Sequence, residues 1–544
     1  MYDIAVIGGG IVGAAICRQL LLKNSKLCIA MIEKEKSLGL HQSKYNSGVI
    51  HAGVYYRPES LKAKLCTEGM RRSYDYLKEK KIKHNQCGKL IVATKPHHFK
   101  MLDVIYERSK RNKLNVEFLD NINAIKSIEP LCSGLRAIYL NDTGIVDWHM
   151  VTESFGKDFK DMGGDILLEH ECQKFEMDGD TVKTICKKNN VTNSVKSKYV
   201  ITAGGLFSDK MSILTDGPLY PKLIPFRGNF LKYKKGVHFT PKVDSNILLG
   251  PNVLLSLKRE GYTWKDFDFK DSKEIFTYPG FWKLAFSNIG FGVSEILKQV
   301  ITTLMIREMQ QFVPSLKKSE VEDSISGVRA ESVTQSGLLV DDFIFEKGNG
   351  KFSNNTFHIR NAPSPACTSS LAIASHVTLR CFVQNLNLKM NEDTNCQDRK
   401  FSNAKSSDIN QNIKKSVSCN IDRNRYSSVS FFKNIKSVFK PRISKELKGK
   451  ELIDPIKDRI NDVSTSTGSY HFADVDVMVE HSFYDDRTKD LNYIYYAPDT
   501  YLHPSYNKME IIMVKMIDKH NGIHVRSVVT MLPILLNLFL NTSI

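Results

Sequence analysis

The chain has 544 residues, of which 42% are hydrophobic and 25% charged, and its 77 Lys and Arg against 59 Asp and Glu give a formal net charge of +18. This composition is typical of globular proteins, and at ~100–200 residues per domain the length predicts several domains. It excludes a mini-protein, a wholly disordered chain and a fibrous rod. The basic excess fits anionic substrates, a dinucleotide or an acidic membrane surface, and we expect no nucleic-acid partner because the sequence carries no motif of that class.

Cysteine usage and apolar runs bear on the compartment. The 11 cysteines are scattered without a Cys-x-x-Cys pair, which indicates free thiols in a reducing environment. The first predicted strand begins almost at Met1, so we expect no signal or transit peptide before it. No apolar run reaches the ~18 residues of a membrane span, and residues 528–540, which include Pro533, are predicted to be a buried or interfacial segment.

The first elements predict one dinucleotide-binding unit. Apolar residues 2–7 form a strand that is buried on both faces, and the glycine-rich turn of residues 8–13 leads into a helix that ends near Leu21. A second apolar strand, residues 27–32, ends at an acidic residue. In such units one glycine makes the turn, one admits a pyrophosphate, one lets the helix pack on the sheet, and the acid binds ribose. These roles fall on Gly8, Gly10, Gly13 and Glu33, and the alternative is a glycine-rich turn without a ligand.

Helices and strands alternate through the next part of the chain. We predict helices over residues 70–80, 97–111 and 150–162 and strands over residues 89–94 and 199–203. Aromatic residues, glycines and prolines between residues 229 and 291 favour an antiparallel sheet with long loops. The alternation of apolar and polar residues from 321 to 359 favours further strands.

Residues 41–56 form a polar, glycine-bearing stretch whose small side chains suit a second part of a cofactor. It contributes Ser43, Asn46, Ser47 and Gly48 as cofactor-binding candidates. From this stretch on, the chain resembles the L-2-hydroxyglutarate dehydrogenases, a family of D-amino-acid-oxidase-like flavoproteins. Further matching motifs occupy residues 57–63, 249–252, 257–262, 327–330 and 358–366. Together they cover about residues 1–380 in family order, and the combination is specific.

The resemblance implies a function. It implies FAD as cofactor and oxidation of L-2-hydroxyglutarate to 2-oxoglutarate, with hydride passing to the flavin and electrons passing on to a quinone or an electron-transfer protein. It also implies a mitochondrial location and peripheral membrane association. Two alternatives stay open: another FAD-dependent oxidoreductase that acts on an amino acid, an amine or a glycerol phosphate, and a catalytically impaired FAD-binding remnant. The remnant is motivated by the short connection at residues 229–235 and by Glu331, where the family usually has Gln.

The implied fold is α/β. A Rossmann-like FAD-binding domain is interleaved with an antiparallel-sheet substrate domain, and a partly disordered C-terminal extension follows. The expected boundaries give the FAD-binding domain residues 1–75, 146–225 and 321–381, the substrate domain residues 76–145 and 226–320, a basic disordered linker residues 382–468, and an extension of unknown role residues 469–544.

The expected reaction sets requirements for side chains. Hydride removal from a hydroxyl-bearing carbon needs a base for the O–H proton beside an electron sink. His51 is the leading base because it follows the cofactor loop and imidazole titrates near neutrality, although it could instead only hydrogen-bond the flavin or the backbone. His238 is the competitor and is assigned to the substrate site. Cations for a dicarboxylate are assigned to Arg227, Lys258, Arg259 and Arg329, and a structural ion pair is the alternative for each; no metal site is predicted.

Two backbone features predict flavin contacts. Gly204 follows a strand and lets the backbone approach FAD, unless it is a plain strand-end turn. Ser364 is the predicted N-cap of a helix with Pro365 at its first position, followed by Ala366. This helix N-terminus suits the negative charge that develops on the flavin, and the alternative is an ordinary capped helix.

Overall fold

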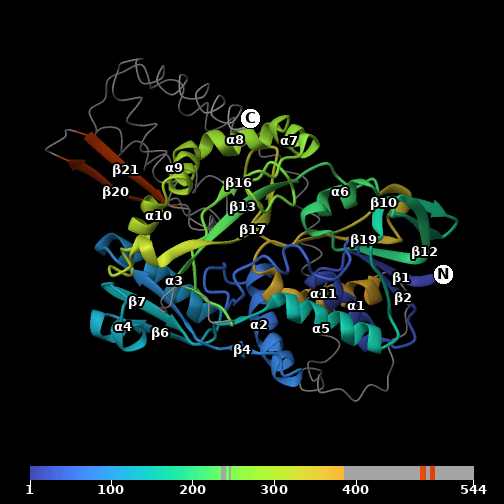
Figure 1. Ribbon diagram of the computed structural model, residues 1–544, viewed down its shortest axis with the longest axis horizontal. Coiled ribbons are helices and arrows are strands. Elements are labelled where there is room, and N and C mark those ends of the chain that lie inside the picture. The colour runs from blue at the N-terminus through green and yellow to red at the C-terminus, as the bar shows by residue number, and fades with distance from the viewer. Residues whose placement is uncertain (234–239, 244–246, 385–477, 486–489, 497–544) are drawn as a thin grey trace, which may run out of the picture. The chain divides into compact units, whose positions relative to one another are not determined.

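The computed structural model describes residues 1–233, 240–243, 247–384, 478–485 and 490–496 (Figure 1). Its largest sheet has eight strands in the order β10-β11-β12-β1-β2-β9, with β19 paired to β12 and β18 to β19. These are β1 (Tyr2–Ile7), β2 (Ile29–Ile32), β9 (Asp165–Leu167), β10 (Glu171–Asp178), β11 (Thr181–Lys188), β12 (Val191–Thr202), β18 (Ile344–Lys347) and β19 (Thr356–Asn361). The pairs β1–β2, β1–β12, β2–β9 and β12–β19 are parallel, which confirms the Rossmann-like fold.

Helices pack against one face of this sheet. They are α1 (Ile11–Lys23), α2 (Leu61–Glu79), α5 (Trp148–Asp161) and α11 (Ala366–Gln384), which lie together in Figure 1. Ile4 and Val6 of β1 join the apolar core beneath these helices, whereas Ala5 and Ile7 join a second core on the opposite face. The prediction of a first strand buried on both faces is therefore confirmed.

A second sheet lies next along the chain. Its strands are β13 (Lys222–Tyr233), β14 (Thr240–Pro241), β15 (Ile247–Leu249), β16 (Leu254–Leu255) and β17 (Val321–Val333). Antiparallel pairing of β13 with β17 runs from Lys222 opposite Val333 to Tyr233 opposite Val321. The expected domain boundary between residues 225 and 226 falls inside β13, and β17 joins this sheet although that boundary scheme gives its residues to the FAD-binding domain.

Two three-stranded sheets and, besides α2, two further α-helices come from residues 49–146. One sheet contains β3 (Val49–Ile50), β4 (His84–Asn85) and β8 (Gly144–Val146), and the other contains β5 (Lys89–Ala93), β6 (Val116–Leu119) and β7 (Arg136–Leu140). The helices are α3 (Phe99–Arg111) and α4 (Ile122–Ile128). The helices predicted at 97–111 and 150–162 and the strand predicted at 89–94 are confirmed within a few residues at their ends. The helix predicted at 70–80 and the strand predicted at 199–203 are confirmed as elements, but α2 begins at Leu61 and β12 at Val191, well before the predicted starts.

The expectation of an antiparallel sheet up to residue 291 is wrong beyond β16. After α6 (Ser208–Ile213) and the second sheet, the chain forms α7 (Phe269–Phe276), α8 (Pro279–Ser287), α9 (Ile289–Val300) and α10 (Thr302–Met309). Asp268 caps α7 by accepting from the Asp271 N–H, and Pro279 occupies the first turn of α8, so both helices begin with strong signals. Among the aromatic residues that suggested strands, Tyr278 and Phe281 pack in an apolar core with Ile224 of β13, whereas others, such as Phe269 and Phe286, are exposed.

The C-terminal part is described only as a hairpin of β20 (Met478–Asp485) and β21 (Asp490–Tyr496). It belongs to a separate compact unit. The expected linker beyond Gln384 and the apolar segment at 528–540 lie outside the described residues. Within the described part, no single helix is long and apolar enough to cross a membrane, whereas α9 and α10, bent by 105° at their junction, meet that length and composition together.

Candidate active site

The glycine turn after β1 has no room for side chains at two positions. Gly8 has φ of +108°, and a Cβ there would lie 2.4 Å from the Ala203 carbonyl oxygen. A Cβ on Gly13 would lie 1.9 Å from the Gly8 carbonyl oxygen, so only glycine allows α1 to pack this closely on the turn. Gly10 directly precedes the first residue of α1, and a glycine has no side chain that could cap the N–H groups of the first turn, which have no acceptor within the helix.

A cavity of about 850 Å³ begins at this turn. It gathers the following predicted site residues: Gly8, Gly10, Glu33, Ser43, Asn46, Ser47, His51, Gly204, Arg329, Pro365 and Ala366. Gly13, Gly48, Arg227, Lys258 and Arg259 do not line it, and His238 lies outside the described residues. Residues from distant parts of the sequence therefore meet around one space of the size that holds a large ligand.

Glu33 and Ser43 are held by the backbone next to the glycine turn. The Glu33 carboxylate accepts from the Gly9 N–H at 2.6 Å and from the Glu35 N–H at 2.9 Å. The Ser43 hydroxyl accepts from the Ile11 N–H at 2.9 Å, at the N-terminus of α1. A carboxylate offers about four acceptor positions, so Glu33 can still accept from ribose hydroxyls in this orientation.

Asn46 and Gly48 shape the loop that follows Ser43. The Asn46 side-chain amide donates to the carbonyls of Gln42 and Ser43 at 3.0 and 2.9 Å, and its oxygen accepts from the Gly48 N–H at 2.9 Å. Gly48 has φ of +76°, and a Cβ there would lie 2.8 Å from the Val146 carbonyl oxygen. Asn46 and Gly48 therefore position the loop. Ser47, which lies between them, lines the cavity next to Asn46.

His51 lines the cavity with an imidazole that makes no hydrogen bond to any residue the structure describes. Its backbone is fixed, because its N–H donates to Thr368 Oγ1 at 3.1 Å and its carbonyl accepts from Cys66 Sγ at 3.3 Å. Burial, followed by the positive charges of Lys89, Arg329 and Lys62, lowers the pKa of His51 to about 3. This corrects the expectation of titration near neutrality: the imidazole is neutral at physiological pH, with a lone pair free to accept a proton.

Two cations of the cavity have no carboxylate partner among the described residues. Arg329 and Lys89 both line the cavity, and the Lys89 ammonium lies 4.7 Å from the centre of the Tyr55 ring. The third cation near His51, Lys62, is instead paired with Asp341 at 2.5 Å. Sequence reasoning missed Lys89, because nothing in its predicted strand distinguishes it from an ordinary surface lysine.

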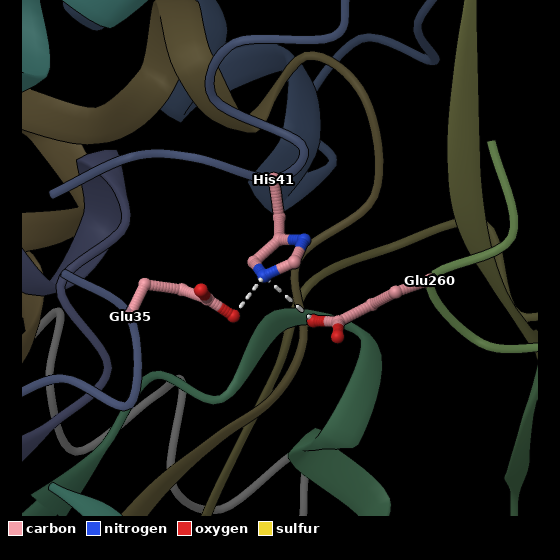
Figure 2. Close-up of side chains that lie close together, drawn as sticks. All are labelled: Glu35, His41 and Glu260. Carbon is pink, nitrogen blue, oxygen red and sulfur yellow. Dashed lines mark hydrogen bonds and ion pairs between the residues drawn. The ribbon is translucent and has the colours of Figure 1, made fainter. Parts of the chain in front are cut away.

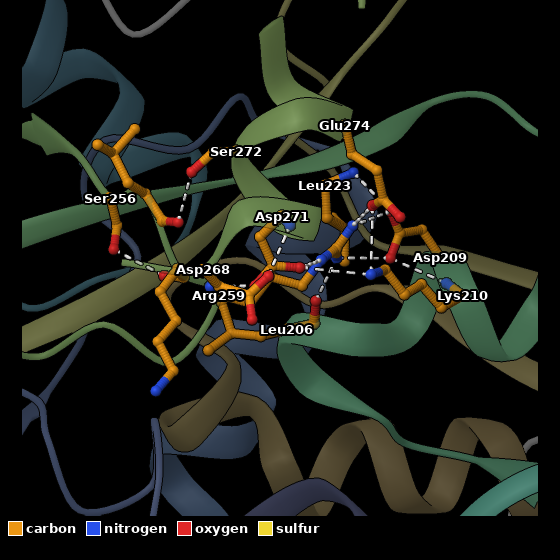
Figure 3. A network of polar contacts seen from close by, with 12 residues as sticks. Leu206, Asp209, Lys210, Leu223, Ser256, Arg259, Asp268, Asp271, Ser272 and Glu274 are labelled. Atoms are coloured by element: carbon orange, nitrogen blue, oxygen red, sulfur yellow. Dashed lines mark hydrogen bonds and ion pairs between the residues drawn. The ribbon is translucent and has the colours of Figure 1, made fainter. Parts of the chain in front are cut away.

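Arg259 lies in a buried ion-pair network (Figure 3). Its guanidinium donates to both carboxylate oxygens of Asp209, at 2.8 and 3.0 Å, and to the Leu206 carbonyl at 2.6 Å. The side chains of Arg259 and Asp209 are only 6% and 3% exposed. Burial lowers the pKa of Arg259, but Asp209 together with Glu274 and Asp271 outweighs burial and raises it overall. This is the structural alternative that the sequence left open for this residue.

The remaining predicted cations also lie away from the cavity lining. Arg227 donates to the Thr263 carbonyl and stacks over the Trp264 ring at 4.8 Å, while its Nε has no partner among the described residues. Lys258 is exposed. Of the four cations assigned from the sequence, Arg329 is the one that the structure brings to the cavity.

A second polar cluster at the cavity wall joins Glu35 and His41, which follow β2, to Glu260, which follows β16 (Figure 2). His41 Nε2 lies 2.8 Å from Glu35 Oε1 and 3.1 Å from Glu260 Oε1. These three residues have the types and spacing of metal ligands. The Lys34 ammonium, however, lies 2.5 Å from Glu260 and 3.5 Å from Glu35, so it supplies the positive charge that the two carboxylates need.

The helix α11 presents its N-terminus to the cavity. It begins at Ala366, and the Pro365 carbonyl accepts from the Ser369 N–H at 2.9 Å, so Pro365 and not Ser364 occupies the cap position. The cavity is lined here by Pro365, Ala366 and Cys367. It is also lined by Gly204, which follows the end of β12. The described residues fit FAD: a side-chain-free turn with helix N–H groups for phosphates, an acid for ribose and a second helix N-terminus.

Comparisons with known proteins agree with this geometry. Residues 3–380 match the family described as FAD dependent oxidoreductase. The mitochondrial L-2-hydroxyglutarate dehydrogenase of Caenorhabditis elegans is 42% identical over 400 residues, covering 69% of this chain and 92% of that protein. The human protein of the same description is 40% identical over 405 residues, covering 69% and 88%.

Among solved structures, dithionite-reduced L-alpha-glycerophosphate oxidase from Mycoplasma pneumoniae with FAD bound has a TM-score of 0.57 at 20% identity and covers 72% of this chain and 97% of that one. Glycine oxidase from Bacillus cereus has a TM-score of 0.51 at 18% identity and covers 70% and 96%. At these identities the two structures show the fold alone.

Proposed function

Because the chain belongs to the FAD-dependent oxidoreductase family, we infer that it oxidises L-2-hydroxyglutarate to 2-oxoglutarate in mitochondria, with FAD as cofactor. The substrate and the location are those in the names of relatives that are about 40% identical over more than two thirds of this chain. The structural observation that carries the inference is the meeting of an unpartnered imidazole, two unpaired cations and the glycine turn around one cavity.

The residues that would hold FAD follow from the site. Gly8, Gly10 and the first turn of α1 suit the pyrophosphate, Glu33 the ribose, and the α11 N-terminus the ring that gains negative charge. When bound, FAD supplies the acceptor for the hydride. We propose that Asn46 and Gly48 act by shaping the loop and not by direct contact.

The cations and His51 would divide the remaining work. Arg329 and Lys89 bind the two carboxylates of the substrate, and a ring nitrogen of His51 accepts the proton from the substrate hydroxyl. Burial and then these two cations hold the pKa of His51 down, so a dianion that neutralises the cations makes His51 a stronger base. Substrate binding thereby activates the group that deprotonates it.

The electron acceptor and the membrane contact are finer proposals. We propose that electrons pass on to a quinone or an electron-transfer protein and that the protein associates peripherally with a membrane. Support for the membrane contact comes from exposed large apolar side chains between residues 264 and 301: Trp264, Phe267, Phe269, Phe276, Phe286, Leu297, Val300 and Ile301. Co-sedimentation of the holoenzyme with vesicles tests it, and a protein that stays in the supernatant at all lipid concentrations contradicts it.

Anaerobic bleaching of the flavin tests the function. Purified holoenzyme should be yellow, and L-2-hydroxyglutarate should abolish the flavin absorbance, whereas glycine, sarcosine and glycerol 3-phosphate should not. Bleaching by one of these three and not by the hydroxy acid would assign another oxidoreductase activity. Tight flavin without bleaching by any of them would support the impaired remnant.

A further inference from the structure

Glu331 is a carboxyl group that the reaction above does not use. It lies on β17, two residues after Arg329, and both residues line the cavity that contains His51. Its carboxylate makes no hydrogen bond or ion pair within the part of the chain that the structure describes. The charged groups near it are Arg329 on the same strand, Lys62 on α2 and Asp341 before β18.

The charged groups near Glu331 and His51 balance a dicarboxylate only when Glu331 is neutral. Lys62 and Asp341 form a pair at 2.5 Å and cancel each other. Arg329 and Lys89 then contribute two unpaired positive charges, which match the two negative charges of a dicarboxylate. An ionised Glu331 would leave one negative charge in excess inside the cavity, and an uncompensated buried charge is costly.

We propose that Glu331 is a specificity-determining residue whose carboxyl carries a proton while a dicarboxylate occupies the cavity, so that binding of the dianion takes up one proton. The proposal rests on the proposed function and adds a role for this residue. Burial raises the pKa of Glu331 against the opposing effect of Arg329 and Lys62, while Asp341 adds to the rise, and this direction favours the protonated carboxyl. A proton on the carboxyl also turns it from a repelling group into a hydrogen-bond donor toward the substrate.

Calorimetry with the product measures this proton directly. The FAD-loaded enzyme is titrated with 2-oxoglutarate, a dicarboxylate that cannot reduce the flavin, in buffers of different ionisation enthalpy between pH 6 and 9. Where Glu331 is ionised in the free enzyme, wild type should take up close to one proton per ligand, and its affinity should fall about tenfold per pH unit. Glu331→Gln should take up none and should bind with a flat pH dependence over the same range.

Two further variants separate Glu331 from other sources of a proton. His51→Asn should keep the uptake, because in this proposal the proton resides on Glu331. Glu117→Gln, at an exposed position of β6, should behave as wild type. The proposal is overturned if wild type binds 2-oxoglutarate without proton uptake across the range, if Glu331→Gln retains it, or if His51→Asn abolishes it. Failure of 2-oxoglutarate to bind either wild type or Glu331→Gln refutes the dicarboxylate substrate itself, and this role of Glu331 with it.

Discussion

Replacement of Arg259 by Met tests whether this residue holds the fold or the substrate. The change removes the guanidinium from Asp209, whose side chain is only 3% exposed, and leaves that carboxylate with two backbone donors, the N–H groups of Lys210 and Leu223. Loss of one partner of a buried ion pair costs about 3–5 kcal/mol. The two remaining hydrogen bonds place the expected cost at the lower end of this range.

This loss of unfolding free energy corresponds to a fall in the melting temperature. Unfolding entropy of about 2.1 cal/mol/K per residue gives about 0.8 kcal/mol/K for a unit of about 380 residues, so 3–5 kcal/mol corresponds to a fall of about 4–6 °C. Differential scanning fluorimetry of the holoenzyme measures it. The double variant Arg259→Met/Asp209→Leu should recover most of the loss, because no charge is then left buried without a partner. Lys258→Met, which removes an exposed neighbouring cation, should move the melting temperature by less than about 1 °C.

The opposite pattern would refute this reasoning. If Arg259 were a substrate clamp, Arg259→Met would leave the melting temperature at the wild-type value and raise KM for the hydroxy acid. Asp209→Leu alone would then leave KM unchanged, whereas the ion-pair interpretation expects it to destabilise the protein as Arg259→Met does.

Further changes test the cofactor turn, the base and the core. Gly13→Ala should abolish FAD binding, because its Cβ would lie 1.9 Å from the Gly8 carbonyl oxygen; yellow protein of normal flavin content would contradict this. His51→Asn should lower kcat about 10²–10⁴-fold while flavin content stays the same, and parallel loss of both would make His51 a cofactor ligand. In wild type, kcat/KM should decrease on acidification only below pH 5, since the pKa of His51 is lowered to about 3 in the free protein. Burial lowers the pKa of His358 to about 4, so the folded state favours the neutral ring, and stability should fall by about 1.4 kcal/mol per pH unit as pH drops below about 6.5. Urea titrations should show a smaller fall for His358→Gln, and an equal fall would show that other groups dominate.

Local signals explain what the sequence could predict. The turn at Gly8, the helix after it and the acid at Glu33 are all specified within one short segment, where each residue type has a direct steric or hydrogen-bonding reason. The position of His51 at the cavity could be predicted because this residue follows the cofactor loop closely. The buried first strand likewise shows in its apolar run from Ile4 to Ile7.

Partners distant in the chain explain what the sequence could not predict. Arg259 is a structural cation because Asp209 lies 50 residues earlier, and no local pattern separates such a cation from one that binds substrate. Lys89 lines the cavity together with residues from distant parts of the chain, such as Arg329, and its own strand does not reveal this meeting. The aromatic residues of α7 and α8 have high strand propensity, but Asp268 and Pro279 start helices there. Of these aromatic side chains, Phe281 is buried, whereas Phe269, Phe276 and Phe286 are exposed.

The hydrogen bond from the His51 N–H to Thr368 has a consequence for biosynthesis. These two residues are 317 positions apart, and β12, which pairs with β1, needs β19 as its other parallel neighbour. At about 5–20 residues per second, the ribosome completes the first dinucleotide-binding elements some 15–60 s before it delivers α11, whose Thr368 holds the His51 backbone. The nascent chain must wait through that interval with an open sheet edge. A newly made chain that retains flavin has therefore already docked α11 against its N-terminal elements.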